Sequence, residues 1–161
     1  MGLLLALLLA QDPNDLNQSG IDKERRGDLN GALADYEKAI EINSKEPAYH
    51  SNRGNILRTL GRSHDALEAY NLALQLNPNF ANAYTGRGNV QDDYGAHAQA
   101  EADYSKAIEL GPSDLNAIVN RAQARTKRGD LDGAGQDLAR ALALDPASVR
   151  VYNARANLGS A

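Results

Sequence analysis

The sequence predicts an all-α fold in which short helix–turn–helix units repeat along the chain. Three observations support this prediction. Glycine and alanine recur at the same positions every 34 residues over four copies. Each copy holds two stretches with the apolar spacing of an amphipathic helix. Glycine and proline separate these stretches, where helices commonly end. Since one such unit cannot bury its apolar face alone, the units must stack, and we expect a solenoid with a continuous core.

The period is clearest when residues 47–80, 81–114 and 115–148 are aligned, with residues 13–46 one period upstream. One glycine position and two alanine positions persist through all four copies. They are Gly27, Gly61, Gly95 and Gly129, then Ala32, Ala66, Ala100 and Ala134, and then Ala39, Ala73, Ala107 and Ala141. Proline recurs at Pro78, Pro112 and Pro146, and Ser44 is the exception.

Residues 1–12 stand apart from the repeats. The apolar run from Leu3 to Ala10 is far shorter than the ~20 residues that span a bilayer. It resembles the apolar part of a secretory signal, but no Lys or Arg precedes it. Three interpretations stay open for this segment: a truncated or atypical export signal, a short helix that caps the first repeat, or a stretch foreign to the natural protein.

The first unit, residues 13–46, has a weak opening helix, because Leu16 and Ile21 are its only large apolar residues. Its second helix, from Leu29 to Ile42, has the ordinary pattern. Terminal repeats are expected to be atypical, since one of their faces meets water.

The second unit, residues 47–80, shows the full pattern. We expect a helix from Ala48 to Leu60 that ends at Gly61, with Ser63 and Asp65 as candidates to cap the next helix. The same arrangement is predicted for residues 81–114 and 115–148. Residues 149–161 supply a first helix without a second, either as a C-terminal capping helix or as the start of further repeats.

These positions resemble the tetratricopeptide repeat (TPR) family, whose 34-residue pattern carries Gly, Ala, an aromatic residue, Ala and Pro at these intervals. The matching residues are Gly54, Ala66, Tyr70, Ala73 and Pro78, then Gly88, Ala100, Tyr104, Ala107 and Pro112. The resemblance extends over about residues 13–158. It implies a right-handed superhelical α-solenoid whose first helices line a concave groove for a protein or peptide partner. The sequence departs from the family at its Leu position, which holds Arg in four copies.

Composition excludes several classes of function. A formal net charge of −4 argues against nucleic acid or an anionic membrane surface as the partner. The chain has no cysteine, and its three histidines lack ligand spacing, so neither a metal site nor a cofactor is expected. No catalytic constellation is present, and we expect no enzyme activity. A membrane is a partner only if residues 1–10 are an export signal or an anchor, and the compartment, cytoplasmic or exported, stays open.

The arginines at the family's Leu position require partners, because unpaired buried charge is costly. Asp35, Asp103 and Asp137 are the candidates. Pairing within a repeat joins Arg87 to Asp103 and Arg121 to Asp137, and it leaves Asp35 facing Ser19. Pairing between repeats joins Asp35 to Arg53, Asp103 to Arg121 and Asp137 to Arg155. The second scheme uses every aspartate, so we expect these structural inter-repeat pairs.

Asparagines concentrate where the resemblance places the groove. Ten of the fifteen lie in the four columns that contain Ala48, Ser51, Asn52 and Asn55. Asn is a mediocre helix residue, but its amide can bind a peptide backbone. The predicted peptide-binding residues are Asn52, Asn55, Asn82, Asn89, Asn116, Asn120, Gln123, Arg150 and Asn157. The alternative is a solvated polar face.

The family's carboxylate clamp is only partly present. Asn89 and Asn120 match it and Arg150 stands where Lys is common, but Thr85 and Ala154 replace its other two cations. We therefore expect a non-enzymatic protein–protein interaction scaffold that binds an extended peptide segment. One alternative is the substrate-recognition portion of a larger enzyme, such as a protein glycosyltransferase. Another is export-linked assembly at a membrane.

Overall fold

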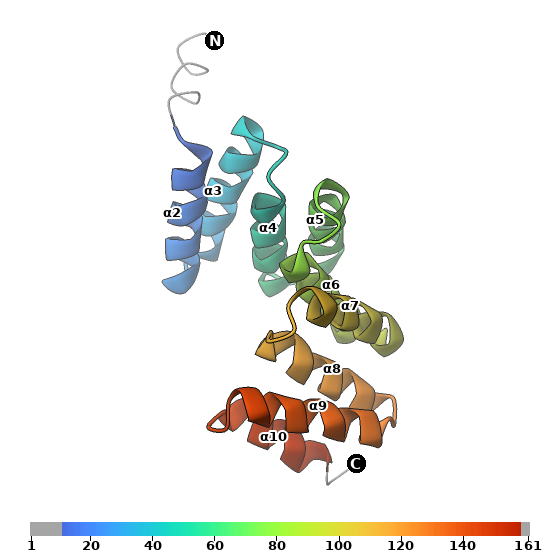
Figure 1. The fold of residues 1–161 in the computed structure, drawn as a ribbon. Coiled ribbons are helices and arrows are strands. Elements are labelled where there is room, and N and C mark those ends of the chain that lie inside the picture. The colour runs from blue at the N-terminus through green and yellow to red at the C-terminus, as the bar shows by residue number, and fades with distance from the viewer. Residues whose placement is uncertain (1–10, 159–161) are drawn as a thin grey trace. The chain divides into compact units, whose positions relative to one another are not determined.

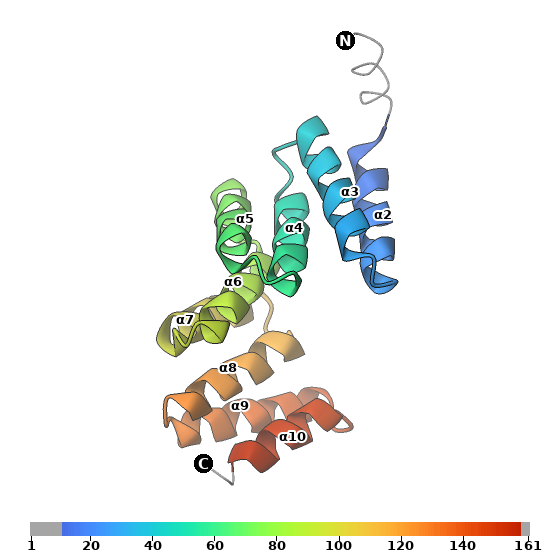
Figure 2. The ribbon, with the colours of Figure 1, turned by 180° about the vertical axis from the view of Figure 1, so that it is seen from behind.

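The computed structural model describes residues 11–158, and the prediction for the apolar segment lies almost wholly outside this range. The described chain is built of helices joined by short turns and holds no strand, which confirms the all-α prediction (Figures 1 and 2). Its helices are α2 (Pro13–Arg25), α3 (Leu29–Ile42), α4 (Pro47–Thr59), α5 (Ser63–Leu76), α6 (Ala81–Asp93), α7 (His97–Leu110), α8 (Leu115–Lys127), α9 (Leu131–Leu144) and α10 (Val149–Leu158).

The chain divides into two units, residues 1–78 and 79–161. In the first, α2 packs on α3, α3 on α4, and α4 on α5. In the second, α6 packs on α7, α7 on α8, and α8 on α9, while α10 contacts both α8 and α9. Each unit therefore consists of successive antiparallel helix pairs.

The turn inside each pair depends on glycine. Gly27, Gly61, Gly95 and Gly129 have φ values of +80°, +76°, +75° and +82°, a region that favours glycine. Immediately after Gly61, the Arg62 N–H donates to the Leu57 carbonyl at 2.8 Å, which closes the helix end in the manner of a Schellman motif.

The helix starts differ partly from the prediction. Pro47 opens α4 as its first residue, where its missing N–H costs nothing. Ser63 and Asp65 do not cap α5, which begins at Ser63 with Arg62 in the N-cap position and no side-chain cap. Asp65 instead binds the Arg62 guanidinium at 2.7 Å. Asp28 and Asp130 cap α3 and α9 by accepting from the N–H groups of Gly31 and Gly133.

The core is centred on a tyrosine from the second helix of each of the first three pairs. The rings of Tyr36, Tyr70 and Tyr104 are buried. Each ring lies against a glycine of its own first helix, Gly20, Gly54 or Gly88. A methyl group added at Gly54 or Gly88 would lie 2.8 Å from the ring, and one at Gly20 would lie at 2.6 Å.

The fourth pair changes both partners of this contact. Leu138 replaces the tyrosine and Ala122 replaces the glycine, and both are buried. The smaller, more flexible leucine leaves room for the methyl group of Ala122. The two positions therefore act as a matched pair.

We predict that Gly54→Ala lowers the free energy of unfolding by about 1–3 kcal/mol, because the new methyl group overpacks the Tyr70 ring. Adding Tyr70→Leu should recover part of the loss, since it reproduces the Ala122 and Leu138 combination. Urea unfolding followed by circular dichroism measures both effects. The control is Gly135→Ala, at a helical glycine whose added methyl would meet only Leu158 at an ordinary 3.8 Å. Unchanged stability in Gly54→Ala would contradict the close contact.

Candidate functional site

The repeated 16-residue spacing of arginine and aspartate produces ion pairs inside each helix pair of the second unit. Arg87 binds Asp103 with two hydrogen bonds of 2.7 Å, and Arg121 binds Asp137 at 2.9 and 2.6 Å. The two carboxylates are only 9% and 4% exposed. The hydrogen bond from Arg87 to Asp103 raises the pKa of Arg87. Such bidentate contacts are among the stronger polar interactions in proteins.

Asp35 is satisfied differently in the first unit. It accepts from the Ser19 hydroxyl at 2.6 Å and pairs with the Lys23 ammonium at 2.6 Å. Burial opposes ionisation of Asp35, but the hydrogen bonds from Lys23 and Ser19 outweigh it and hold the pKa of the carboxyl below its ordinary value. Arg53 meets Glu37 of the preceding helix pair at 3.4 Å.

The inter-repeat pairs expected from the sequence are therefore not the pairs that form. Asp35 does not pair with Arg53, and the partners of Asp103 and Asp137 lie within their own helix pairs. The inter-repeat scheme uses every aspartate, but Lys23 is the partner of Asp35. Arg87 lies six residues before the end of α6 and Asp103 six residues after the start of α7, so antiparallel packing sets them at the same level. Asp137 is bound by Arg121 and Arg125, and Arg155 is exposed on α10.

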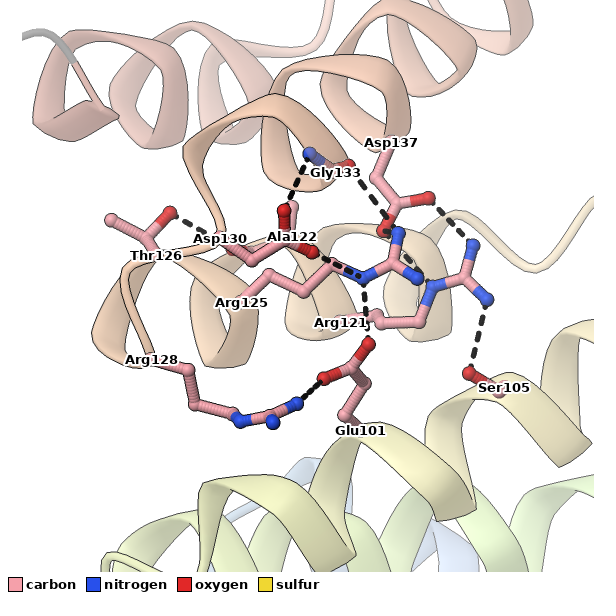
Figure 3. Close-up of polar contacts among 10 residues, drawn as sticks. All are labelled: Glu101, Ser105, Arg121, Ala122, Arg125, Thr126, Arg128, Asp130, Gly133 and Asp137. Atoms are coloured by element: carbon pink, nitrogen blue, oxygen red, sulfur yellow. Dashed lines mark hydrogen bonds and ion pairs between the residues drawn. The ribbon is translucent and has the colours of Figure 1, made fainter.

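Several ion pairs across a repeat boundary of the second unit involve residues that the sequence did not single out. Arg125 of α8 donates to Glu101 of α7 at 2.9 Å and to Asp137 of α9 at 2.8 Å (Figure 3). Arg128 also binds Glu101, and Arg121 donates to Ser105 at 3.1 Å. This network joins three helices across a repeat boundary. Arg125 escaped notice because its column is occupied elsewhere by Lys23, Leu57 and Gln91.

The network shifts the ionisation of Glu101. Burial alone would raise the pKa of this carboxyl, but hydrogen bonds from Arg125 and Arg128 outweigh burial and lower it. Burial likewise opposes the charge on Arg125, while its bond to Glu101 and the charge of Asp137 raise its pKa.

The predicted asparagines of the second unit form a chain of hydrogen bonds along the first helices. Asn89 of α6 accepts from the Tyr104 hydroxyl at 2.9 Å and from the Asn120 amide at 2.7 Å. Asn120 and Asn116 of α8 both accept from the guanidinium of Arg150 in α10. The structure therefore brings these four predicted residues together, and the remaining one on α6, Asn82, is exposed.

The first unit repeats the motif on a smaller scale. The Tyr70 hydroxyl donates to Asn55 at 2.7 Å, and Asn52 donates to Asn17 at 2.8 Å. Burial raises the pKa of Tyr70, so its hydroxyl stays protonated and can donate at any physiological pH. The sequence marks Tyr70 and Tyr104 only as residues that match the family pattern. Their hydroxyl groups are an unpredicted part of the site.

The direction of these hydrogen bonds determines whether the asparagines expose hydrogen-bond donors or acceptors to a ligand. The carbonyl oxygens of Asn55 and Asn89 accept from buried tyrosines. Their amide N–H groups make no hydrogen bond to any residue in the described range. An asparagine held in this way presents donors rather than acceptors. The surface around Asn55 in the first unit, and likewise the surface around Asn89 in the second, is therefore suited to ligands that carry carbonyl or carboxylate oxygens.

Gln123 and Asn157 lie in a separate part of the second unit. Together with Thr126, Lys127 and Ala154 they line a pocket of about 330 Å³ between α8 and α10. Close by, Asp92 binds Lys127 and His97, each at 2.6 Å. This carboxylate therefore holds the Lys127 ammonium in place.

Residues 11–158 contain no group of three His, Asp or Glu side chains arranged to hold a metal ion. Within the same range no helix is long and apolar enough to span a membrane.

Comparisons with known families give three matches. Models described as "Tetratricopeptide repeat" match residues 47–80 and 85–149, and one described as "TPR repeat" matches residues 25–61. No curated protein sequence matches the chain significantly.

Solved structures with the same fold are numerous. A tetratricopeptide repeat protein from Parabacteroides merdae is 27% identical, with 89% of this chain and 56% of that one covered and a TM-score of 0.75. MamA is 24% identical over 83% of this chain and 78% of that one, with a TM-score of 0.74. The first TPR of Spaghetti (RPAP3), bound to an HSP90 peptide, is 24% identical over 73% of this chain and 94% of that one, with a TM-score of 0.69.

The revised pairing can be tested with two double-mutant cycles. Asp103→Ala should lower the free energy of unfolding by about 1–3 kcal/mol, because it leaves Arg87 without this carboxylate. Combined with Arg87→Leu, the two changes should cost less than the sum of the single ones. Combined with Arg121→Leu, they should be nearly additive. Stronger coupling to Arg121 than to Arg87 would restore the inter-repeat scheme.

The Glu101 network should make stability depend on pH. Because the folded pKa of Glu101 is lowered, the unfolded chain binds more protons in the acidic range, so stability falls as pH drops through the folded pKa. Glu101→Gln should therefore reduce the loss of stability between pH 7 and pH 3, as measured by urea unfolding at each pH. Glu41→Gln, at an exposed site on α3, is the control and should change the profile little. Equal profiles for wild type and Glu101→Gln would contradict the role of the network.

Proposed function

Since the chain belongs to the tetratricopeptide repeat family, we propose that it is a non-enzymatic scaffold that binds an extended segment of a partner protein. The segment lies along the first helices of the repeats, with its backbone held by asparagine side chains. The partner is a protein or peptide, and recognition depends little on its side chains at these positions.

The observation that carries the proposal is the tyrosine–asparagine hydrogen bond. It recurs at Tyr70 with Asn55 and at Tyr104 with Asn89. In each case a buried hydroxyl fixes the amide before any ligand arrives. Preorganised donors bind more tightly because less side-chain entropy is lost on binding. An extended backbone offers a carbonyl oxygen at every residue, so a peptide segment can meet such a donor on either unit.

Arg150 gives the second unit a cation on the same face. Its guanidinium is held by the neutral carbonyl oxygens of Asn116 and Asn120. No carboxylate of the described residues shares these contacts. A peptide that carries an acidic group would therefore gain affinity from an ion pair with Arg150. The Spaghetti repeat structure, bound to its HSP90 peptide, shows that a chain of this fold can hold a peptide. Since Thr85 and Ala154 stand in place of two cations, a full carboxylate clamp is not proposed.

The test is peptide binding by the double variant Asn55→Ala with Asn89→Ala, which leaves Arg150 and its two asparagine partners in place. Peptides are first selected on the wild-type protein from a randomised display library. Each amide contact contributes about 0.5–1.5 kcal/mol, so the double variant should bind them about tenfold to a hundredfold more weakly. Because the amides are neutral, this loss should be nearly the same at low and high salt. Titration calorimetry at two ionic strengths measures both.

Asn30→Ala is the matched control, because Asn30 is an exposed asparagine on a second helix and outside the four columns. Circular dichroism should show intact helix in all variants, since Ala is the better helix former. If the double variant binds as tightly as wild type with its helices intact, the asparagines are a solvated polar face.

A further inference from the structure

The pocket between α8 and α10 is a separate feature of the face that the asparagines line. Gln123, Thr126 and Lys127 contribute from α8, and Ala154 and Asn157 contribute from α10. Its volume of about 330 Å³ is at the lower end for small-molecule sites, which run from ~300 to ~1,000 Å³. An open pocket of this size on a peptide-binding face fits a single large side chain better than a whole small molecule.

Comparison with the preceding repeat explains why the pocket exists. Between α6 and α8, Asn120 donates across to Asn89, and this bond bridges the two helices. One repeat later the equivalent residues are Gln123 and Ala154. Alanine cannot make the bond, and Leu138, which replaces the tyrosine, has no hydroxyl to hold Gln123. The Gln123 amide accordingly makes no hydrogen bond within residues 11–158.

The interior of the pocket favours an uncharged group. Ala154 is 6% exposed and forms the floor, because the other lining residues are half-buried or exposed. The Thr126 hydroxyl already donates to the Ala122 carbonyl at 2.9 Å. The Lys127 ammonium is paired with Asp92. No carboxylate lines the pocket, so a basic side chain would meet Lys127 without a partner.

We propose that this pocket binds one aliphatic side chain of the partner peptide, of the size of Val, Leu, Ile or Met. Gln123 lies at the rim, where its amide meets the peptide backbone beside that residue. The inference rests on the proposed function and adds a side-chain preference at one position of the peptide. Ala154 is then a residue that determines specificity.

The test compares peptide selections by the wild type and by Ala154→Asn. The variant places at position 154 the residue that occupies position 120, so it can bridge to Gln123 and close the pocket. Ala156→Asn is the matched control, because it makes the same change at an exposed position of α10 outside the pocket. All three proteins select from one randomised display library, after circular dichroism has shown equal helix content. If Ala154→Asn loses helix, Ala154→Leu replaces it, since this change fills the pocket with an apolar group.

Wild type and Ala156→Asn should enrich an aliphatic residue at one fixed position, and the pocket-filling variant should not. Replacing that residue by Ala in a selected peptide should weaken binding to wild type about tenfold or more, with little effect on binding to the variant. Selected peptides without aliphatic enrichment, or with the same enrichment in the variant, would overturn the pocket and leave the asparagine face standing. Enrichment of Asp or Glu instead would also overturn it, in favour of an ionic site at Lys127. Failure of wild type to select any peptide would overturn the proposed function itself.

Discussion

The close contact between a tyrosine ring and a glycine is the constraint on which most of this structure depends. In the first three helix pairs the ring lies where a Cβ of the first helix would be, at Gly20, Gly54 and Gly88. Without a side chain at that point, the two helices approach closely and bury the ring completely. Burial of an aromatic ring is one of the larger single contributions to a core. In the fourth pair, Ala122 and Leu138 fill the space that glycine and tyrosine occupy in the other pairs.

The same contact also shapes the face that we propose binds a peptide. Gly54 and Gly88 each precede an asparagine, and the tyrosine ring that crosses the glycine brings its hydroxyl to that amide. The same tyrosine therefore packs the two helices together and fixes the asparagine so that it presents its N–H groups as donors. In the fourth pair, Leu138 stands in place of the tyrosine, so no hydroxyl holds the amide of Gln123. A pocket lies next to Gln123 in this pair. A substitution in the core therefore changes how the neighbouring side chain on the surface is held.

Charge pairs hold the repeats by a second mechanism. Arg87 and Arg121 replace an apolar residue, but the aspartate partner of each lies in the same helix pair, so the charge is compensated before the repeats stack. Glu101, Arg125 and Arg128 add ion pairs across the boundary of the last two full repeats. These residues are not periodic. Adjacent repeats can thus be joined by different polar contacts.

The sequence by itself determined the helices and their order, because apolar spacing and the glycine turns are local properties that the 34-residue period repeats. It also placed Asn89, Asn116, Asn120 and Arg150 on one face, since equivalent positions share a face. Only the tertiary structure decided which charges pair. Arg121 is spaced almost equally from Asp103 and Asp137 along the chain, and the choice depends on which second helix its side chain faces. The direction of the amide hydrogen bonds and the pocket at Ala154 also required the fold, because each depends on which atoms of neighbouring helices fill the space between them.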